Sequence, residues 1–350
     1  MPFRPDTLSA IAAARFDTVI DVRSPSEFAR DHLPGALNLP VLDDDERARV
    51  GTLYTQVSPF DARKLGAALV ARNTARHLEQ SLAHHPGGWR PLVYCWRGGM
   101  RSNAFALILR QIGWRAEVLE GGYKTWRHLV ATMLYERPLA LRVVLLEGNT
   151  GTAKTELLPH LAALGVQCLD LEALAGHRGS LFGAQGPQPA QTGFESRLAG
   201  ALDALDPARP LLLEAESARI GDIRLPPALW EAMKAAPRIA LTAPLAERAR
   251  YLARTYADIA ADPARLSATI DALRPFQPAE RIAAWQALAA AGAHAALCEG
   301  LMQHHYDPRY ARHRARGPAP AAVIAADSLA PEALPALAAR ISAALCASSG

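Results

Sequence analysis

The chain has 350 residues, 50% of them hydrophobic, and a net charge of +4. This length is enough for two domains with separate cores, and no apolar run is long enough to span a membrane. The first ten residues also lack an export signal, so membrane and secreted proteins are excluded and a soluble cytoplasmic protein with no membrane partner is expected.

The cysteines and basic residues narrow these expectations. Cys95, Cys168, Cys298 and Cys346 have neither the spacing of a disulfide framework nor that of metal ligands. Free thiols and no metal site are therefore expected in a reducing compartment. Only four residues are lysines, and arginine supplies the remaining positive charge. Mild basicity of this kind permits an RNA partner without requiring one.

Strands and helices alternate over the first part of the chain. The predicted strands cover residues 16–22, 37–42, 91–94 and 116–119, and the predicted helices cover 24–30, the charged stretch at about 43–85, and 102–112. This alternation indicates an α/β domain with a parallel sheet. We place it at residues 1–136, with the helical stretch at about 43–85 as an insertion closed by Pro86-Gly87-Gly88.

A second α/β unit is predicted at residues 137–317. Its expected strands are 141–146, 166–169, 211–214 and 238–242, and its expected helices are 156–164, 246–260 and 278–291. Residues 318–350 are rich in alanine and proline. They are predicted to form either a strand and a helix or a loosely held tail.

A cysteine and a glycine loop lie between the predicted strand 91–94 and the helix after it. Backbone N–H groups of such a loop form an anion cradle, and the helix N-terminus adds partial positive charge. Arg97 and Arg101 add full charges, so the pKa of Cys95 should fall below its free value of about 8.5. A thiolate in a cradle can attack sulfur, selenium or phosphorus carried on an anion. The expected catalytic residues are Cys95, Arg97 and Arg101, and the rest of the anion loop is Trp96, Gly98, Gly99 and Met100.

The sequence of this loop is compatible with two other interpretations. Cys95 followed by a glycine turn also fits a buried cysteine at a strand end, and Cys95 to Arg101 followed by Ser102 has the spacing of a cysteine phosphatase. The upstream sequence decides between them, because segments 21–28 (DVRSPSEF) and 32–38 (HLPGALN) resemble the N-terminal signature of rhodanese domains. That resemblance implies a rhodanese-like parallel sheet in which Asp21 ends the strand beside the active loop.

The second unit opens with a phosphate-loop pattern. Residues 148–155 (GNTGTAKT) nearly match Walker A, so Lys154 is expected to reach a phosphate oxygen and the Thr155 hydroxyl to coordinate Mg²⁺. Ala153 stands where the pattern has glycine, which leaves ATP binding and hydrolysis open. The alternative is a glycine-rich turn with an incidental lysine. The expected phosphate-binding residues are Gly148, Thr150, Gly151, Thr152, Lys154 and Thr155, in a P-loop NTPase-like α/β domain.

Two glutamates follow the apolar run 211–213. Glu214 or Glu216 is expected to hold Mg²⁺ or a water, as a Walker B acid would. The alternative is a carboxylate at the sheet end that forms a salt bridge with Arg219.

Two groups of arginines are each open to two interpretations. Arg248, Arg250 and Arg254 have helical spacing, and they form either a lid over bound phosphates or a charged helix face. Arg309 and Arg312 lie among histidines and tyrosines, a mixture that suits RNA backbone contact and stacking on an unpaired base. The alternative is a solvated basic helix end. The rest of this second group is His304, His305, Tyr306, Tyr310, Arg314 and Arg316.

Taken together, the motifs are similar to those of one family. The unbroken run 95–102 (CWRGGMRS), the segment 121–124 (GGYK) and the opening of the phosphate loop at 146–148 (LEG) resemble tRNA 2-selenouridine synthases. Further matching segments are 43–46, 51–54, 169–172, 177–183, 214–217 and 305–308, so the resemblance covers about residues 15–312. Ala153 departs from the pattern, and the C-terminal segment carries no recognised motif.

The resemblance implies a transferase. Such an enzyme converts 2-thiouridine at the tRNA wobble position to 2-selenouridine with selenophosphate, through an S-geranyl-2-thiouridine intermediate made from geranyl diphosphate. Cys95 would receive selenium, and we expect no tightly bound cofactor. Our own hypothesis is that residues 148–155 hold the diphosphate, although ATP and RNA phosphate remain alternatives. The anticodon region of tRNA is the implied macromolecular partner.

Two other functions compete with this one. The first is a rhodanese-type sulfurtransferase with a regulatory P-loop domain. The second is a nucleotide-binding adaptor with an inactive rhodanese fold, against which the intact Cys95 and its arginine-lined loop argue.

Overall fold

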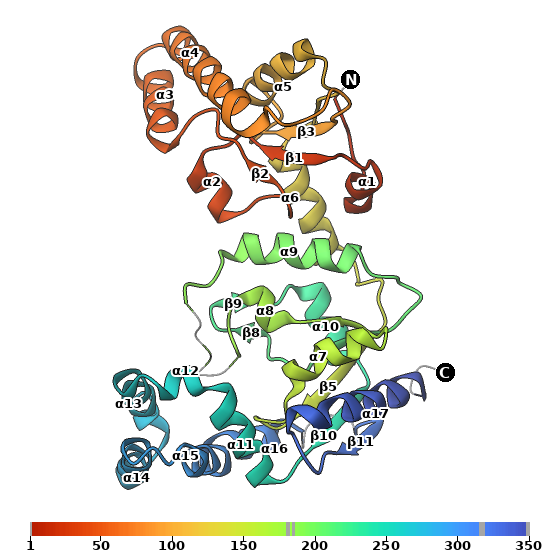
Figure 1. Ribbon diagram of the computed structural model, residues 1–350, viewed down its shortest axis with the longest axis vertical. Coiled ribbons are helices and arrows are strands. Elements are labelled where there is room, and N and C mark those ends of the chain that lie inside the picture. The colour runs from red at the N-terminus through yellow and green to blue at the C-terminus, as the bar shows by residue number, and fades with distance from the viewer. Residues whose placement is uncertain (1, 180–182, 184–185, 315–318, 348–350) are drawn as a thin grey trace. The chain divides into compact units, whose positions relative to one another are not determined.

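The computed structural model describes residues 2–179, 183, 186–314 and 319–347, and it does not describe the side chains of 312–314. The chain forms two compact units (Figure 1). The first contains residues 1–138 and 189–205, and the second contains residues 139–188 and 206–350. Each unit is built around its own parallel sheet.

The first sheet has four parallel strands in the order β2-β1-β3-β4. Their bounds are β1 Thr18–Asp21, β2 Leu37–Asn38, β3 Pro91–Tyr94 and β4 Glu117–Val118. All four residues of β3 are buried, as expected of a central strand in a parallel sheet. Asp21 pairs in register with Tyr94, so the chain after β3 begins beside the end of β1.

Seven helices surround this sheet in the described residues of the first unit. They are α1 Leu8–Ala13, α2 Pro25–Arg30, α3 Asp44–Gln56, α4 Pro59–His77, α5 Met100–Ile112, α6 Tyr123–Ala131 and α9 Gln191–Asp203, and π-helical turns follow α4 at Leu78–Leu82 and α6 at Thr132–Glu136. The predicted helical insertion is the pair α3 and α4. A capping box joins Asp43 and Glu46 at the start of α3, and Ser58 caps α4 before Pro59.

The helix α9 comes from the second half of the chain but packs on the first unit. Its Glu195 accepts hydrogen bonds from Arg127 and Tyr135, each at 2.6 Å. The Trp126 indole donates to the Ser196 hydroxyl at 2.9 Å. The sequence-based boundary at 136/137 assigned these residues to the second domain, because partners about sixty residues apart leave no local pattern in the sequence.

The second sheet has five parallel strands in the order β11-β10-β5-β7-β6. Their bounds are β5 Val143–Gly148, β6 Gln167–Leu169, β7 Leu211–Glu214, β10 Arg238–Thr242 and β11 Ala322–Ala325. A separate antiparallel hairpin pairs β8 Arg219–Ile220 with β9 Ile223–Arg224. The strand β5 is central and buried throughout, and it leads directly into the glycine loop.

The helices of the second unit cover its sheet and form an additional helical cluster. They are α7 Lys154–Ala163, α8 Leu171–Ala175, α10 Pro227–Ala235, α11 Leu245–Thr255, α12 Ala257–Ala260, α13 Pro263–Asp271, α14 Ala279–Ala290, α15 His294–Leu301, α16 Asp307–Arg314 and α17 Leu334–Ala347, with a π-helical turn at Met302–Tyr306 and 3-10 turns at Arg274–Phe276 and Pro331–Ala333. The helix predicted at 246–260 is divided at Tyr256 into α11 and α12. No helix in the described part of the chain is long and apolar enough to cross a bilayer.

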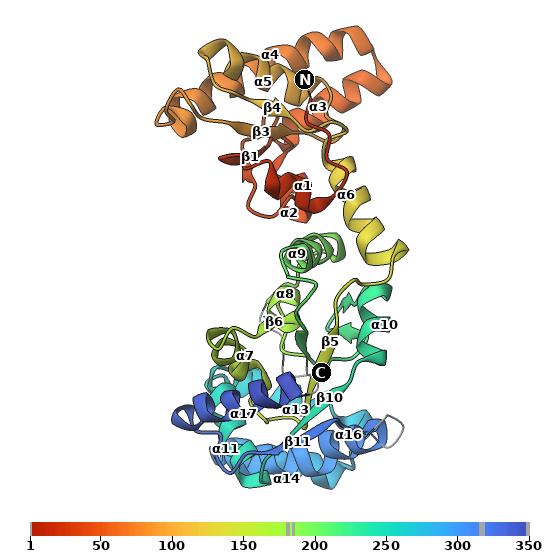
Figure 2. The ribbon, with the colours of Figure 1, turned by 90° about the vertical axis from the view of Figure 1, so that its right-hand side faces the viewer.

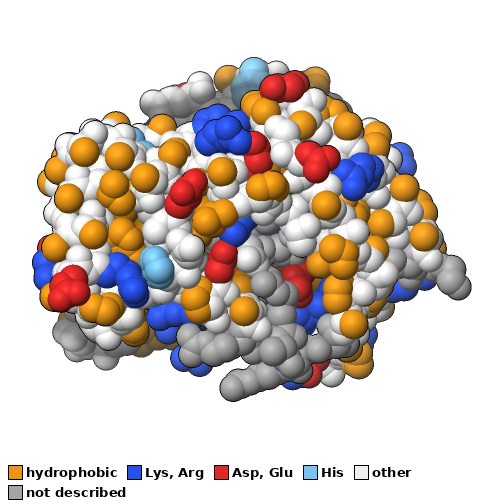
Figure 3. Space-filling model, turned by 90° about the horizontal axis from the view of Figure 1, so that it is seen from below, with side chains coloured by type: hydrophobic (Ala, Val, Ile, Leu, Met, Phe, Trp, Pro, Cys, Tyr) orange, Lys and Arg blue, Asp and Glu red, His pale blue; other side chains and the backbone are white. Residues whose placement is uncertain are grey.

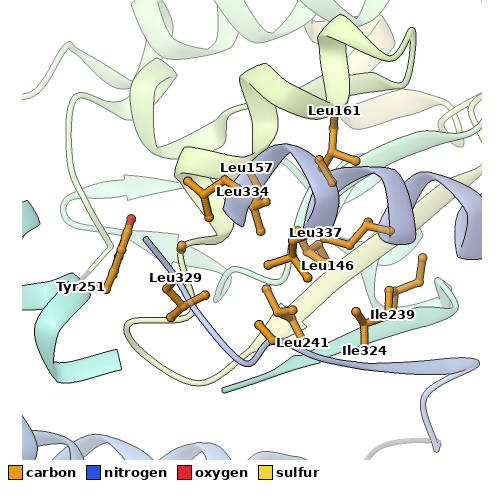
Figure 4. Close-up of a cluster of buried hydrophobic side chains, with 14 of the residues drawn as sticks. Leu146, Leu157, Leu161, Ile239, Leu241, Tyr251, Ile324, Leu329, Leu334 and Leu337 are labelled. Carbon is orange, nitrogen blue, oxygen red and sulfur yellow. The ribbon is translucent and has the colours of Figure 1, made fainter. Parts of the chain in front are cut away.

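The C-terminal segment is a strand and a helix rather than a loose tail. β11 extends the sheet beside β10, and α17 packs beside α7 (Figure 2). In Figure 4, Leu334 and Leu337 of α17 lie in one cluster with Leu146 of β5 and Leu241 of β10. This alanine-rich sequence therefore completes the core of the second unit.

Candidate functional site

Cys95 lies in the first unit, directly after β3 and before α5, as the sequence predicts. Its side chain is buried, and its Sγ lies 3.2 Å from the hydroxyl oxygen of Ser102. Burial raises the pKa of the Cys95 thiol. Hydrogen bonds from the Ser102 hydroxyl and from the backbone of Ser102 and Arg97, together with the charge of Arg101, outweigh burial and lower this pKa below its ordinary value. The site therefore favours a thiolate.

The loop after Cys95 is held from behind by the turn that precedes α6. The backbone N–H of Tyr123 donates to the carbonyl of Cys95 at 2.8 Å, and that of Lys124 donates to the carbonyl of Trp96 at 3.2 Å. Gly122 has φ +60°, and a Cβ there would overlap the Cys95 carbonyl oxygen. The sequence GGYK is thus a structural support of the anion loop, a role that its local pattern did not reveal.

The thiol lies in a cleft of about 1160 Å³. Arg101 lines this cleft and donates to Glu27 at 3.2 Å, while Arg97 is exposed at its edge. The side chains of Trp96 and Met100 are 39% and 69% exposed. All of the predicted anion-loop residues except Gly98 therefore line one opening, although Arg101 is already paired with a carboxylate.

A buried ion pair behind the cleft was not assigned a role from the sequence. Arg23 binds both carboxylate oxygens of Asp21, and both side chains are almost completely buried. The Arg23 guanidinium lies 4.0 Å from the ring centre of Tyr123, whose hydroxyl donates to Asp31 at 2.6 Å. These contacts fix the turn behind the anion loop. In the sequence, only the charged residues of segment 21–24 (DVRS) could have indicated this ion pair.

In the second unit, the phosphate loop connects β5 to α7. Gly151 has φ +83°, and a Cβ there would lie 2.9 Å from the Leu252 side chain. Ala153 is also in the left-handed region, with φ +59° and ψ 24°. This backbone explains why the Walker pattern has glycine at position 153, and it shows that alanine adopts the same conformation at an energetic cost.

The loop faces a pocket of about 600 Å³. Lys154 donates from Nζ to the carbonyl of Gly148 at 3.2 Å, and Thr155 donates to Glu214 at 3.1 Å. All the predicted phosphate-loop residues except Gly148 line this pocket, and Gly148 ends the strand beneath it. A lysine and a helix N-terminus that face one pocket suit an anion.

Four glutamates line this pocket, and the pKa values of three of them are raised. Burial raises the pKa of Glu214 to about 7, and burial together with the nearby Glu216 and Glu214 raises that of Glu172 to about 9. The pKa of Glu216 is raised as well, mainly by burial. The Oε1 atom of Glu214 is buried without a hydrogen-bond partner. In the described residues, no group of three or more His, Cys, Asp or Glu has the geometry to hold a metal ion by itself.

The predicted arginine groups lie in different surroundings. Arg248 is buried and binds Asp307 at 2.7 Å and the carbonyl of Thr150 at 3.1 Å, so it supports the phosphate loop from within the protein. Arg250 pairs with Glu247 in its own helix, and Arg309 lies over the Phe276 ring at 5.0 Å. Three further arginines form ion pairs: Arg178 with Asp258, Arg254 with Glu156, and Arg219 with Asp222 rather than with the predicted glutamates.

Some predicted residues lie outside the description. The side chain of Arg312, and residues 180–182 of the predicted 177–183 segment, are not among the described parts of the chain. On the face shown in Figure 3, the described Lys and Arg side chains are separated by hydrophobic and acidic ones and form no continuous basic patch.

Comparison with known proteins gives a consistent result. A rhodanese-like domain model matches residues 5–129, and a model described as the tRNA 2-selenouridine synthase AAA domain matches residues 141–276. The chain is 34% identical over 330 residues to tRNA 2-selenouridine synthase of Cupriavidus pinatubonensis, which covers 84% of this chain and 87% of that protein. It is 37% identical over 260 residues to the Nitrosomonas europaea protein of the same name, covering 72% and 66%. For the Cronobacter sakazakii protein of that name, the identity is 40% over 267 residues, covering 72% and 68%.

Proposed function

Because the chain belongs to the tRNA 2-selenouridine synthase family, we propose that it replaces the sulfur of 2-thiouridine in tRNA with selenium. The sulfur at the wobble position is first alkylated by geranyl diphosphate, and selenium from selenophosphate then displaces the geranyl thiol. The observation that carries this proposal is the Cys95 loop, where a buried thiol with a lowered pKa faces an arginine-lined cleft.

The anion loop suits selenophosphate. This substrate is a compact anion, and the loop offers backbone N–H groups, the start of α5 and two guanidinium groups. Arg101 is the nearer charge, since it is part of what lowers the pKa of Cys95, and the exposed Arg97 is free to turn toward a bound phosphate. The salt bridge to Glu27 holds Arg101 at the cleft until an anion competes for it.

The phosphate loop suits the diphosphate of geranyl diphosphate. In the alkylation, a carbon–sulfur bond forms at C1 of the geranyl group, the carbon–oxygen bond breaks, and diphosphate leaves with the electron pair. Lys154 and the N–H groups at the start of α7 would stabilise the charge of this leaving group. The 2-thiouridine ring loses its N–H proton in this step, so the S-geranylated base carries no charge.

An apolar cavity of about 60 Å³ next to the phosphate loop offers room for a few carbons of an isoprenoid chain. It shares Thr150, Leu252 and Tyr256 with the phosphate pocket. The rest of its lining is largely aliphatic and comes from α12, α13 and α15: Ile259, Ala260, Leu266, Leu297 and Leu301. Apart from Thr150, His294 and Tyr306 these walls are apolar, so a hydrocarbon chain would bury apolar surface against them.

Mg²⁺ is the cation we propose for this pocket. The Thr155 hydroxyl and Glu214 would hold it beside the diphosphate, and it would neutralise charge that develops on the leaving group. The unpartnered Oε1 of Glu214 and the raised pKa of its carboxyl fit a site that gains a cation with its ligand.

Titration calorimetry of Mg²⁺ into the protein with diphosphate should show binding that Glu214→Gln weakens at least tenfold. Equal binding by both proteins would exclude Glu214 as a ligand.

The exchange at C2 involves no oxidation when selenophosphate attacks directly. A carbon–selenium bond forms, the geranyl thiolate leaves with the electron pair, and water then releases orthophosphate. In the alternative route, the Cys95 thiolate attacks the selenium atom and forms a perselenide. The electron pair of the Se–P bond then stays on phosphorus, which leaves as phosphite, and a thiol must later reduce the S–Se bond. Phosphorus NMR of the products therefore tests whether Cys95 itself receives selenium: phosphite is expected if it does, and orthophosphate alone would limit Cys95 to assisting a bound anion.

One reconstitution tests the function. The protein is incubated with 2-thiouridine tRNA, geranyl diphosphate and selenophosphate, and the nucleosides are identified by mass spectrometry. Cys95→Ala should accumulate S-geranyl-2-thiouridine, whereas Lys154→Ala should fail to geranylate but still convert RNA that is already geranylated. Lys234→Ala, at an exposed ion pair on α10, is the matched control and should behave as the unsubstituted protein does.

The same reaction distinguishes the competing sulfurtransferase. If Lys154→Ala left geranylation intact, the diphosphate would have to bind elsewhere. If the unsubstituted protein moved sulfur from thiosulfate to cyanide but formed no 2-selenouridine, the proposal would be replaced by a rhodanese-type sulfurtransferase with a regulatory P-loop domain.

A further inference from the structure

An apolar groove lies beside the Cys95 cleft in the first unit. Its volume is about 530 Å³, and α3, α4 and α5 form its walls. On α4, small residues face it at helical spacing, which keeps the groove open: Ala62, Gly66, Ala67 and Ala71. Val50 and Tyr54 of α3 lie opposite, and Ala104 and Ile108 of α5 complete it. No acidic side chain occurs among these described lining residues.

The groove is continuous with the catalytic cleft. Arg47, Met100 and Arg101 line both. Met100 is 69% exposed and Tyr54 is 55% exposed, although both are large and apolar over much of their surface. Exposed apolar side chains that border a concave surface mark a ligand site more often than single scattered ones do. The arginines lie at the junction, so a polar cleft and an apolar groove meet within one site.

We propose that this groove binds the geranyl chain of the S-geranyl-2-thiouridine intermediate during selenium transfer. The inference rests on the proposed function, which places a ten-carbon hydrocarbon on the sulfur that leaves C2. The reacting carbon C2 must reach the Cys95 loop, and the geranyl chain begins only two bonds from C2, on the other side of the sulfur atom. Many charged side chains line the cleft, whereas the surface of the adjoining groove is almost entirely apolar, so the groove is the better place for the chain to bury its hydrocarbon surface.

This arrangement would also select the substrate. RNA with an unmodified 2-thiouridine has no hydrocarbon to place in the groove, so it would bind more weakly than the geranylated form. The Cys95 loop would then act on a sulfur that is already a good leaving group. The apolar cavity of the second unit would serve the geranylation step, and the groove would serve the selenium transfer that follows it.

The test is equilibrium binding to the full chain. A labelled anticodon stem-loop carries either S-geranyl- or S-methyl-2-thiouridine, and fluorescence anisotropy gives both affinities. The unsubstituted protein should bind the geranyl form at least tenfold more tightly. Ala67→Trp fills the groove and should reduce this preference to less than threefold. Ala68→Trp, at the next residue of α4 and outside the groove lining, should keep the preference.

The outcomes separate this proposal from the proposed function. If the unsubstituted protein forms 2-selenouridine but binds both RNAs equally, or if Ala67→Trp keeps the full preference, the groove assignment is overturned and the function stands. If the geranyl preference is present and groove-dependent but no 2-selenouridine forms, the function is overturned and the groove stands. Ala71→Glu, which places a charge in the groove with less added bulk than tryptophan, should repeat the loss if Ala67→Trp folds poorly. A change in oligomeric state with either variant would identify the groove as a protein interface instead.

Discussion

At the scale of single residues, Cys95 lies between opposing effects on its pKa. Burial alone would make it an ordinary, poorly ionised thiol, as it does for Cys168, whose pKa burial raises to about 12. Around Cys95, the hydrogen bonds and the charge of Arg101 reverse that effect. The chemistry of the site therefore depends on a few donors whose removal can be measured.

Ser102→Ala should move the ionisation of Cys95 to higher pH. The Ser102 hydroxyl stabilises the thiolate, so its loss favours the protonated thiol and the pKa must rise. Alkylation by iodoacetamide, followed on the Cys95 peptide by mass spectrometry from pH 5 to pH 10, gives the midpoint directly. Cys168 in the same samples is the internal control and should not change. An unshifted Cys95 midpoint would show that the backbone N–H groups and Arg101 suffice.

Ala153 carries a small conformational cost in the phosphate loop. A left-handed backbone costs a residue with a Cβ about 1 kcal/mol, and glycine removes this cost. Ala153→Gly should therefore raise the free energy of unfolding of the second unit by about 1 kcal/mol, as measured by hydrogen exchange at β5. Ala162→Gly, on an exposed and right-handed position of α7, should lower it by about 1 kcal/mol. The same sign for both variants would contradict this account.

At the scale of elements, the loop after β3 depends on the turn before α6. Gly122→Ala places a methyl group against the Cys95 carbonyl, so the loop must shift and its N–H groups must turn away from the thiol. We expect alkylation of Cys95 at pH 7 to slow at least tenfold. Gly87→Ala, where a Cβ meets nothing within 4 Å, should leave the rate unchanged. Normal reactivity in Gly122→Ala would show that the loop tolerates the shift.

The strand and helix at the C-terminus make a second testable element. Leu337 of α17 is buried in the core with Leu146, so Leu337→Ala should lower the stability of the second unit by about 3 kcal/mol. Val323→Ala, on β11 but 64% exposed, should change it by less than about 1 kcal/mol. Urea unfolding of both variants measures the difference. Similar small effects would mean that α17 is bound only weakly.

At the scale of the whole molecule, the chain crosses from one unit to the other more than once. The helix α9 lies between two segments of the second unit in the sequence, but it belongs to the first unit, where it packs against α6. Its carboxylate at Glu195 is almost completely buried and serves Arg127 and Tyr135 together. The stability of the first unit therefore depends on residues that follow the phosphate loop.

Glu195→Ala should destabilise the first unit and spare the second. Removing a charged acceptor from two part-buried hydrogen bonds costs about 2 kcal/mol. Hydrogen exchange should speed up at β3 and stay unchanged at β7. Glu231→Ala, at an exposed ion pair on α10, is the control and should alter neither strand by more than about 0.5 kcal/mol. Faster exchange at β7 instead would place α9 with the second unit.

The sequence by itself determined what depends on neighbours along the chain. The strands 91–94, 211–214 and 238–242 are placed as predicted, because continuous apolar runs between turn signals mark buried parallel strands. The strand–loop–helix arrangement around Cys95 and Lys154 likewise follows from short motifs whose glycines and helix starts are local. A rhodanese-like domain followed by a P-loop α/β domain could therefore be predicted from the sequence.

Only the tertiary structure decided what depends on contacts between distant residues. The support of the Cys95 loop by Gly122, the contact of Arg23 with Tyr123, the approach of Glu172 to Glu214 at the phosphate loop and the position of α9 all join segments far apart in sequence. Arg248 has the helical spacing of a surface residue, yet burial and Asp307 make it a core ion pair. The periodicity of a sequence indicates which face of a helix is apolar, but only tertiary packing determines which distant residues contact that face.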